Sequence, residues 1–216
     1  MNGKRIAIYG AGAFGREVAW LIQACNQISD SYKTDCFIDD NPDIFDKKIN
    51  EIPVRSFKSV CESNASIHLV NAIANSHARQ TVTQKAIDKG FSFETLIYPN
   101  VERSTWVEIG QGSIICAGSI ITTNIVLGEQ VHINVDCTIC HDSILGDFTT
   151  LAPGVHVSGW VHIGKRVFIG TGATIVNGTE DNPLIIGDDV VIGAGACVTN
   201  SLPSRTKVAG VPARSI

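Results

Sequence analysis

Residues 109–175 read IGQGSIICAGSIITTNIVLGEQVHINVDCTICHDSILGDFTTLAPGVHVSGWVHIGKRVFIGTGATI, and every sixth residue of this stretch is aliphatic. Neither an α-helix nor a strand of period two keeps a six-residue repeat on one face. A six-residue period is typical of a parallel β-helix, in which each repeat forms one short strand and one corner. The aliphatic positions are Ile109, Ile115, Ile121, Leu127, Ile133, Ile139, Leu145, Leu151, Val157, Ile163, Ile169 and Ile175.

The period also predicts how the coils stack. Three repeats complete a coil of about 18 residues, so we expect each residue to lie against the residue 18 further along. The period breaks over residues 176–185 and resumes at Ile186, Ile192 and Val198. Five extra residues separate Ile175 from Ile186, and they predict a loop that leaves the coil and returns to it.

Residues 1–97 follow a different pattern. Short β-rich runs at Arg5–Tyr9, Cys36–Ile38, Ile67–Ile73 and Phe93–Ile97 alternate with helical stretches, the second of which is His77–Lys89. This alternation is typical of a small parallel α/β domain. The sequence therefore predicts a Rossmann-like α/β domain over residues 1–97 and a β-helix domain over residues 98–216.

Composition narrows the class of protein. Of the 216 residues, 44% are hydrophobic and 18% charged, which is typical of a globular chain. A net charge of −4 argues against nonspecific binding to nucleic acid or to an anionic membrane. The cysteine count of seven is odd, and the chain enters a strand directly after its first residues, so we expect reduced thiols and a cytoplasmic protein.

An ordered set of motifs along the whole chain resembles a known family. The aliphatic-Gly pairs of the repeats, such as Ile109-Gly110 and Leu127-Gly128, resemble the left-handed β-helix acyltransferases. The full order looks like the sugar O/N-acetyltransferases of bacterial surface-glycan synthesis, which include sialic-acid O-acetyltransferases and nucleotide-4-amino-sugar N-acetyltransferases. The motifs in that order are Gly10-Ala-Gly-Ala-Phe-Gly15, Phe37-Ile-Asp-Asp-Asn-Pro42, Ala72-Ile-Ala-Asn75, Ile139-Cys-His-Asp142, Ile169-Gly-Thr-Gly-Ala173 and Val208-Ala-Gly-Val-Pro-Ala213.

His141 is the candidate general base. It stands two residues past the core position Ile139, so its ring is expected to point out of the coil. An imidazole can accept the proton that an amine or hydroxyl loses as it attacks a thioester, and Asp142 can hold its tautomer. The resemblance assigns the base to His141 and a substrate-contacting asparagine to Asn134. Many relatives carry a second histidine where this chain has Thr150. The substitution argues against a mechanism that needs two histidines.

The cosubstrate implied by the resemblance is acetyl-CoA, with no metal. We expect it to run along corner backbone where glycines permit close approach. These glycines also make tight corners, so the two interpretations stay open. The candidate donor-binding residues are Gly170, Thr171, Gly172, Ala194 and Gly195, with Lys207 and Arg214 near the CoA phosphates.

The turn Gly10-x-Gly12-x-x-Gly15 follows a strand and opens a helix, which is the context of a phosphate-binding turn. By resemblance this domain holds the nucleotide of a nucleotide-linked sugar. The candidate residues are Gly10, Gly12, Ala13, Phe14, Gly15, Asp39, Asp40 and Asn75, and Arg79 follows the same strand as Asn75 as a further candidate. Phe14 stands where many relatives have a histidine, and a turn that only packs a helix remains the alternative.

Other classes stay open at this level. His132, His156 and His162 evoke metal-dependent β-helix hydratases, but no two of them are 18 residues apart, so they fall on different faces. A noncatalytic nucleotide-sugar-binding module and an NAD-dependent enzyme are further alternatives. The α/β part is too short for the second half-sheet that holds nicotinamide.

The sequence thus favours an acetyl-CoA-dependent N-acetyltransferase acting on the amine of a nucleotide-linked 4-amino-4,6-dideoxy sugar. A sialic-acid-type O-acetyltransferase is the nearest alternative. Because a short β-helix has a thin core and gains stability by lateral packing, a homotrimer is expected from the three-sided geometry.

Overall fold

The computed structural model describes residues 3–63 and 66–216. The chain divides into two compact units, residues 1–99 and 100–216. Within the described ranges, no helix has the length and apolar character needed to cross a membrane.

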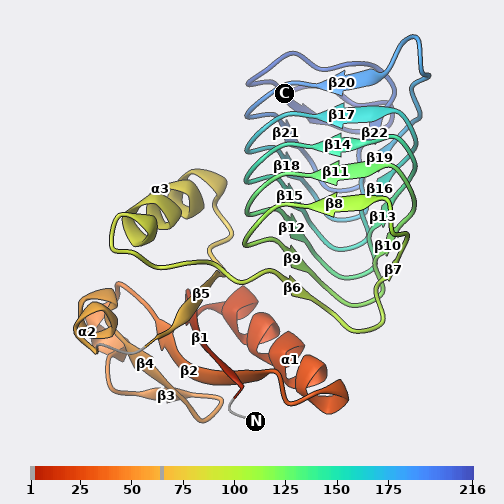
Figure 1. Ribbon diagram of the computed structural model, residues 1–216. Helices are drawn as coiled ribbons and strands as arrows, with labels where there is room; N and C mark the ends of the chain where they lie inside the picture. Colours follow the sequence, from red (N-terminus) through yellow and green to blue (C-terminus); the bar gives the residue numbers. More distant parts are fainter. Residues whose placement is uncertain (1–2, 64–65) are drawn as a thin grey trace. The chain divides into compact units, whose positions relative to one another are not determined.

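The N-terminal unit contains a five-stranded sheet, in which the middle strands are parallel and buried (Figure 1). The strand order is β3 (Lys48–Ile49), β4 (Ile52–Arg55), β2 (Tyr32–Ile38), β1 (Lys4–Tyr9) and β5 (His68–Asn71), with β3 antiparallel to β4. The helices are α1 (Ala13–Ile28), α2 (Phe57–Glu62) and α3 (Ser76–Ile87), with a 3-10 turn at Pro42–Ile44.

Helix α1 is amphipathic, and its buried face includes Val18, Ala19, Leu21 and Ile22. The helix predicted over His77–Lys89 is α3, and the chain reverses after it at Gly90, whose φ of 82° suits glycine. The hairpin β3–β4 and helix α2 were not predicted. They are too short, at two to six residues, to show a period.

One strand predicted from the sequence, Phe93–Ile97, is wrong. Residues Phe93–Ile97 do not form a single strand: Phe93 makes only an isolated parallel bridge with Leu69. Leu96–Ile97 is the separate short strand β6, which belongs to an eight-stranded sheet with the C-terminal strands. An apolar run marks burial, but it does not say in which sheet the residues pair.

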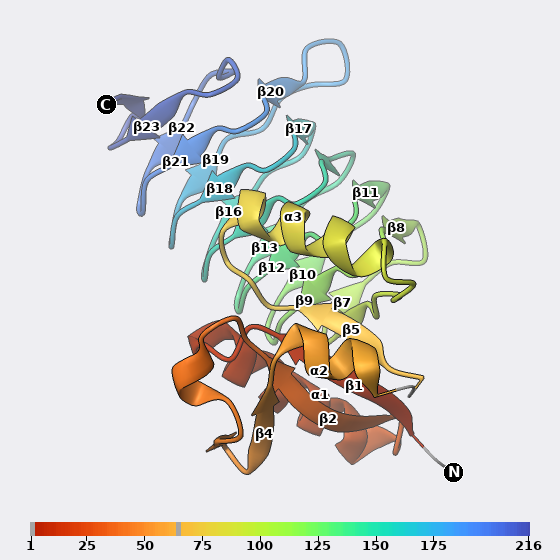
Figure 2. The same ribbon diagram turned by 90° about the vertical axis from the view of Figure 1, so that its left-hand side faces the viewer.

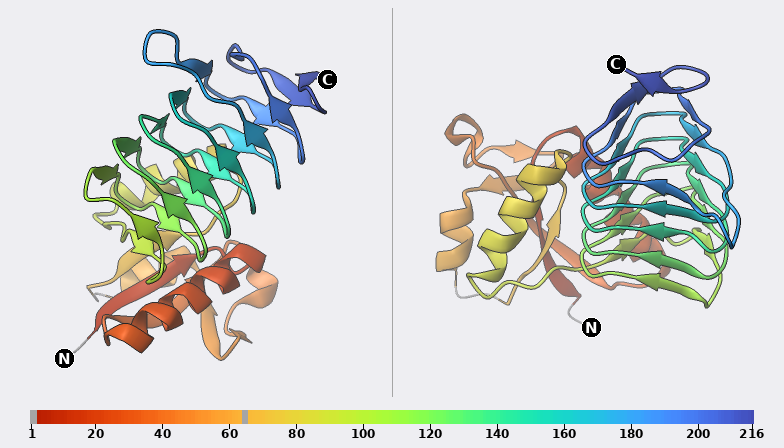
Figure 3. Two further views of the ribbon diagram at one scale, coloured as in Figure 1. Left: turned by 90° about the vertical axis from the view of Figure 1, so that its right-hand side faces the viewer. Right: turned by 90° about the horizontal axis from the view of Figure 1, so that it is seen from above.

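The C-terminal unit is a coil of short parallel strands arranged in three sheets, which appear as three stacked columns in Figures 1 and 3. Strands that pair before the loop after β19 lie 18 residues apart, as Ile121 with Ile139 and Ile139 with Val157. The predicted 18-residue stacking is therefore confirmed. The core positions are almost completely buried, Ile121 and Ile139 at 0% exposure.

The first sheet contains β7 (Glu102–Arg103), β10 (Ile120–Ile121), β13 (Thr138–Ile139), β16 (His156–Val157), β19 (Thr174–Ile175) and β22 (Cys197–Val198). The second contains β8 (Val107–Ile109), β11 (Ile125–Leu127), β14 (Ile144–Leu145), β17 (Val161–Ile163) and β20 (Leu184–Ile186). The third contains β6 (Leu96–Ile97), β9 (Ile114–Ile115), β12 (His132–Ile133), β15 (Thr150–Leu151), β18 (Phe168–Ile169), β21 (Val191–Ile192), β23 (Lys207–Ala209) and β24 (Arg214–Ser215).

The predicted loop lies between β19 and β20 and extends outward beside β20 (Figure 2). Ile163 pairs with Ile186, 23 residues further on instead of 18, which confirms the five extra residues. The loop is shorter than the sequence gap, because Leu184 and Ile185 already pair with Val161 and His162.

Buried hydroxyls tie successive coils together. Ser143 Oγ donates to the carbonyl of Ser158 over 3.2 Å and accepts from the backbone N–H of Val161 over 3.4 Å. The same pair of bonds, to residues 15 and 18 further on, recurs at other positions four residues after a core aliphatic. These positions are Ser113, Ser119 and Thr149.

Candidate active site

His141 and Asp142 lie in the turn that joins β13 of the first sheet to β14 of the second. The same corner recurs one coil before and one coil after. Asn124, Asp142 and Trp160 occupy equivalent positions with φ of 54°, 56° and 58°. Backbone hydrogen bonds fix the stack: Asp142 N–H donates to the Thr123 carbonyl over 3.2 Å, and Trp160 N–H to the His141 carbonyl over 3.0 Å.

The imidazole and two corner side chains form a hydrogen-bonded row. His141 Nδ1 lies 2.8 Å from Asp142 Oδ2, and Asn124 Nδ2 donates to Asp142 Oδ1 over 3.1 Å. The hydrogen bond from His141, and next that from Asn124, hold the pKa of the Asp142 carboxyl below its ordinary value. An ionised carboxylate only accepts, so Nδ1 carries a proton, and in the neutral ring Nε2 then holds the lone pair.

The ring of His141 lies against the next coil. The side chain is 53% exposed, and its ring meets that of Trp160 edge-on, with centroids 6.4 Å apart. The residue directly above it is Gly159, where an added Cβ would stand 2.5 Å from Cε1 and 2.6 Å from Nε2 of the imidazole. The ring therefore occupies space that a side chain at residue 159 would fill.

Asn134 lies at a different corner, in the turn that follows β12 of the third sheet. Its side-chain amide donates to the Leu151 carbonyl over 2.7 Å, so one of the two amide hydrogens binds the backbone of the next coil. Thr150 is 5% exposed and stands beside His132 in the third sheet. Within this chain, neither residue lies at the corner that carries His141.

The candidate donor residues gather on two adjacent corners of the coil. Gly170, Thr171 and Gly172 follow β18, and Ala194 and Gly195 follow β21 in the next coil. Gly195 N–H donates to the Thr171 carbonyl over 2.8 Å. Gly172 and Gly195 have φ of 68° and 66° with open space beyond their Cα atoms, so the backbone there is approachable.

The two cations at the end of the chain lie near these corners. Lys207 opens β23, which pairs with β21, and Arg214 lies in β24, which pairs with β23. Both side chains are exposed. The structure thus places the candidate donor residues in one region of the coil.

The glycine turn of the N-terminal unit lies at the carboxyl ends of the parallel strands. Gly10, with φ of 110°, ends β1, and a Cβ at Gly15 would overlap the Gly10 carbonyl oxygen. Gly12 and Ala13 are exposed at the start of α1, and Phe14 is half-buried there. This arrangement of exposed backbone at a helix start fits an anionic group.

The two acidic residues after β2 serve this turn differently. Asp39 accepts from the backbone N–H of Ala11 over 3.1 Å and from that of Asn41 over 3.0 Å, so its carboxylate shapes the turn. Asp40 is exposed and accepts from the Tyr9 hydroxyl over 3.3 Å. Of the two, Asp40 is better placed to meet a ligand.

The loop after β5 completes this edge of the sheet. Asn75 caps α3 by accepting from the Ala78 N–H over 2.9 Å. The buried guanidinium of Arg79 donates to the carbonyls of Ile73 over 2.9 Å and Ala74 over 3.2 Å. Burial lowers the pKa of Arg79 to about 9, so the group is still charged at neutral pH. The sequence offered Arg79 as a candidate for ligand contact, whereas the structure shows its side chain buried and bonded to the loop backbone.

The three histidines considered for a metal site do not come together. His132, His156 and His162 fall on the third, first and second sheets, as their spacing predicted. No cluster of three or more metal-ligating side chains occurs among residues 3–63 and 66–216.

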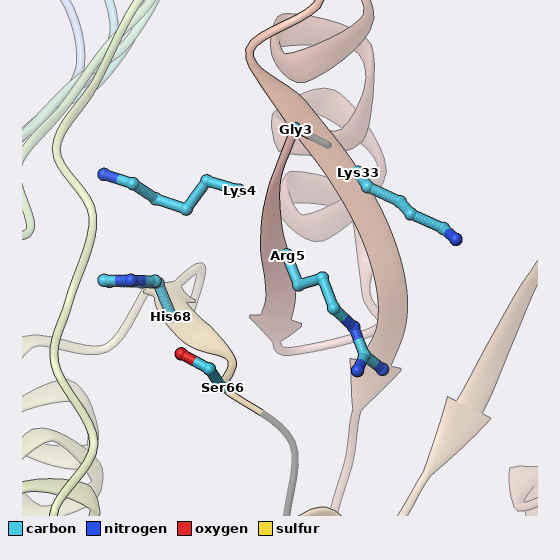
Figure 4. A pocket seen from close by; sticks show the side chains of 6 residues that line it. All are labelled: Gly3, Lys4, Arg5, Lys33, Ser66 and His68. Atoms are coloured by element: carbon cyan, nitrogen blue, oxygen red, sulfur yellow. The ribbon is translucent and has the colours of Figure 1, made fainter. Parts of the chain in front are cut away.

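A cavity of about 330 Å³ lies at the amino ends of β1, β2 and β5, the opposite edge of the sheet from the glycine turn. It contains several basic side chains, but Lys4 and His68 point away from Lys33 (Figure 4). Lys4 pairs with Glu94 and Arg5 with Asp35. These ion pairs neutralise two of the cations, and the basic side chains do not converge on a common position where an anion could bind.

Comparison with known proteins covers both units. Residues 5–86 match the PglD N-terminal domain family, and residues 161–200 match the hexapeptide repeat of succinyl-transferase. The GDP-perosamine N-acetyltransferase of Escherichia coli O157:H7 is 36% identical over 211 residues, which cover 97% of this chain and 95% of that protein.

Two solved structures are similar over nearly the whole chain. The acetyltransferase domain of PglB from Neisseria gonorrhoeae FA1090, in complex with acetyl coenzyme A, is 31% identical with a TM-score of 0.88 and covers 99% of this chain and 100% of that one. A histidine-to-asparagine variant of perosamine N-acetyltransferase from Caulobacter crescentus, in complex with CoA and GDP-perosamine, is 28% identical with a TM-score of 0.89 and covers 98% and 96%. The chain therefore belongs to the hexapeptide-repeat sugar N-acetyltransferases that carry a PglD-type N-terminal domain.

Proposed function

We propose that this protein is an acetyl-CoA-dependent N-acetyltransferase that acts on the amine of a nucleotide-linked 4-amino-4,6-dideoxy sugar in glycan biosynthesis. The observation that carries the proposal is the exposed His141 with Nδ1 on an ionised Asp142, because it presents a basic nitrogen at a corner of a hexapeptide coil. The bound CoA and GDP-perosamine of the Caulobacter relative support both substrates. The family membership supports a left-handed winding of the coil.

The proposed reaction is a direct transfer. The sugar amine attacks the thioester carbonyl carbon, and His141 Nε2 accepts the proton that the amine releases. The tetrahedral intermediate then loses its C–S bond, and the CoA thiolate takes a proton from the imidazolium. Backbone N–H groups at the corners are the available donors for the oxyanion.

An acetyl-enzyme on the buried thiol of Cys137 does not fit the geometry. Cys137 is 0% exposed, and its Sγ donates to the Ala152 carbonyl. Burial raises the pKa of the Cys137 thiol to about 11, so it is not a thiolate near neutral pH. This supports a single transfer step.

The two units have separate tasks in this proposal. The N-terminal unit binds the nucleotide, with the turn Gly10, Gly12, Ala13, Phe14 and Gly15 at its phosphates and Asp40 near the base or ribose. The corners after β18 and β21 bind CoA, with Lys207 and Arg214 toward its phosphates. Asp39 and Asn75 shape the nucleotide site through the backbone.

We further propose that the active protein is a homotrimer. The outer row of the second sheet includes Val126, Ile144 and Ile185, which are 41%, 43% and 52% exposed. Residues of this row lie on successive coils, with His162 between Ile144 and Ile185, so the row is a largely apolar strip suited to a second copy of the coil.

The test is acetyl transfer to a panel of nucleotide-linked amino sugars, with the matching hydroxy sugars as controls. We expect CoA release with the amine acceptors only, and a fall in kcat of about 10²–10⁴-fold in His141→Ala. Unchanged CoA binding in that variant, measured by calorimetry, shows that the fold persists. Turnover of the hydroxy sugars alone, or full activity of His141→Ala, would contradict the proposal.

A further inference from the structure

The corner one coil before His141 carries a side chain that orients the carboxylate beside it. Asn124 lies 18 residues before Asp142, with the same left-handed backbone, so the two side chains stand one above the other. Asn124 Nδ2 donates to Asp142 Oδ1 over 3.1 Å, which turns the other oxygen, Oδ2, toward His141 Nδ1 at 2.8 Å.

The corner one coil after His141 limits the ring from the other side. Gly159 lies 18 residues past His141, and its Cα faces the imidazole without a side chain. A methyl group there would overlap Cε1 and Nε2, and so would displace the ring from its place beside Asp142 and Trp160.

We propose that Asn124 and Gly159 are positioning residues for His141: Asn124 fixes which oxygen of Asp142 meets the ring, and Gly159 leaves the space in which the ring lies. The inference rests on the proposed function of His141 as base. Its geometric part is nevertheless independent of the reaction, because it concerns only the contacts among residues 124, 141, 142 and 159.

The Gly159 part is tested by a double-mutant cycle on stability. In the otherwise unchanged protein, Gly159→Ala should lower the melting temperature because the new methyl group meets the ring. In the His141→Ala background the same change should have almost no effect, since the clashing atoms are absent. Equal losses in both backgrounds would overturn this role, and acetyl transfer does not enter the measurement.

The Asn124 part is tested by kinetics. Asn124→Gly removes the amide and keeps a residue that adopts φ near 54° without strain. We expect kcat to fall by roughly 10- to 100-fold through misorientation of the base, with KM for both substrates nearly unchanged.

A second variant and a control separate orientation from folding. Asn124→Asp keeps the shape, but it places a carboxylate against Asp142 and should lower kcat at least as much as Asn124→Gly. Asp136→Gly changes a corner of equal backbone conformation, with φ of 59°, on another edge of the coil and should leave kcat unchanged. An Asn124→Gly enzyme with normal kcat, or one whose KM for either substrate rises as much as kcat falls, would overturn the role of Asn124. If His141→Ala is fully active while the Gly159 cycle behaves as stated, the proposed base fails and the contact stands.

Discussion

The proton of the active-site imidazole is placed by a neighbour that stays ionised. The pKa of Asp142 is lowered chiefly by its hydrogen bond with His141, so the carboxylate keeps its charge at pH values where free carboxyls become protonated. Its contribution to stability is present at neutral pH and is lost only as the pH falls through that lowered pKa. Above that range, Asp142 remains an acceptor and can hold the proton on His141 Nδ1.

This geometry predicts an unusually harmful conservative substitution, Asp142→Asn. Asn124 would still donate to the side-chain oxygen of residue 142, which turns the new amide N–H₂ toward His141 Nδ1. Nδ1 must then accept, the proton moves to Nε2, and the base is lost. We expect kcat to fall by about 10²–10⁴-fold, as for loss of the imidazole itself.

The comparison variant is Asp142→Gly, which tolerates the φ of 56° and leaves water to set the tautomer. Its kcat should fall less than that of Asp142→Asn. Steady-state kinetics of the two variants measure the difference, and an Asp142→Asn enzyme more active than Asp142→Gly would show that the tautomer is not controlled from this side.

At the scale of the elements, buried hydroxyls predict where the coil is sensitive. Thr149 Oγ1 donates to the Gly164 carbonyl over 2.9 Å and accepts from Val167 N–H over 3.3 Å. Thr149→Val keeps the shape and leaves both backbone groups without this partner, which should cost about 1–3 kcal/mol in the free energy of unfolding. Thr174→Val, at an exposed position of the first sheet, is the control and should have little effect in denaturant titration.

The loop after β5 is the corresponding element of the N-terminal unit. Arg79→Met removes the donors that hold the carbonyls of Ile73 and Ala74. We expect KM for the nucleotide sugar to rise about tenfold or more as the loop loosens, with KM for acetyl-CoA unchanged. Initial-rate kinetics with each substrate varied in turn measure this split. An equal rise in both KM values would mean that the loop does not shape the nucleotide site alone.

The elements also show what the sequence could and could not predict. The 18-residue stacking followed from Ile121, Ile139 and their equivalents, because every core position repeats. Leu96–Ile97 was placed in the wrong sheet, since pairing depends on distant strands. Asp142 was predicted as the partner of His141, but two further neighbours were missed although the period contains them: Asn124 lies 18 residues before Asp142, and Gly159 lies 18 residues after His141. Asp39 was expected to meet a ligand, but its bond to Ala11 N–H spans residues that no local pattern connects.

At the scale of the whole molecule, the outer rows of the coil differ in character. The residue before each core position faces outward, and in the second sheet these residues are the apolar Val126, Ile144 and Ile185, with Glu108 at the start of the row and His162 between Ile144 and Ile185. In the first sheet the same positions include Thr138, His156 and Thr174, with one exposed isoleucine, Ile120. The proposed trimer should therefore form through the second sheet.

A matched pair of substitutions tests this assignment. Ile144 and Ile120 occupy equivalent strand positions and are 43% and 40% exposed, so a change to Asp carries a similar cost in a single chain. Burying an unpaired carboxylate at an interface is far more costly, so Ile144→Asp should dissociate the trimer and reduce activity, whereas Ile120→Asp should do neither. Light scattering after size-exclusion chromatography measures the mass of each variant, and circular dichroism checks that the coil remains. A trimeric Ile144→Asp protein beside a dissociated Ile120→Asp protein would place the interface on the first sheet instead.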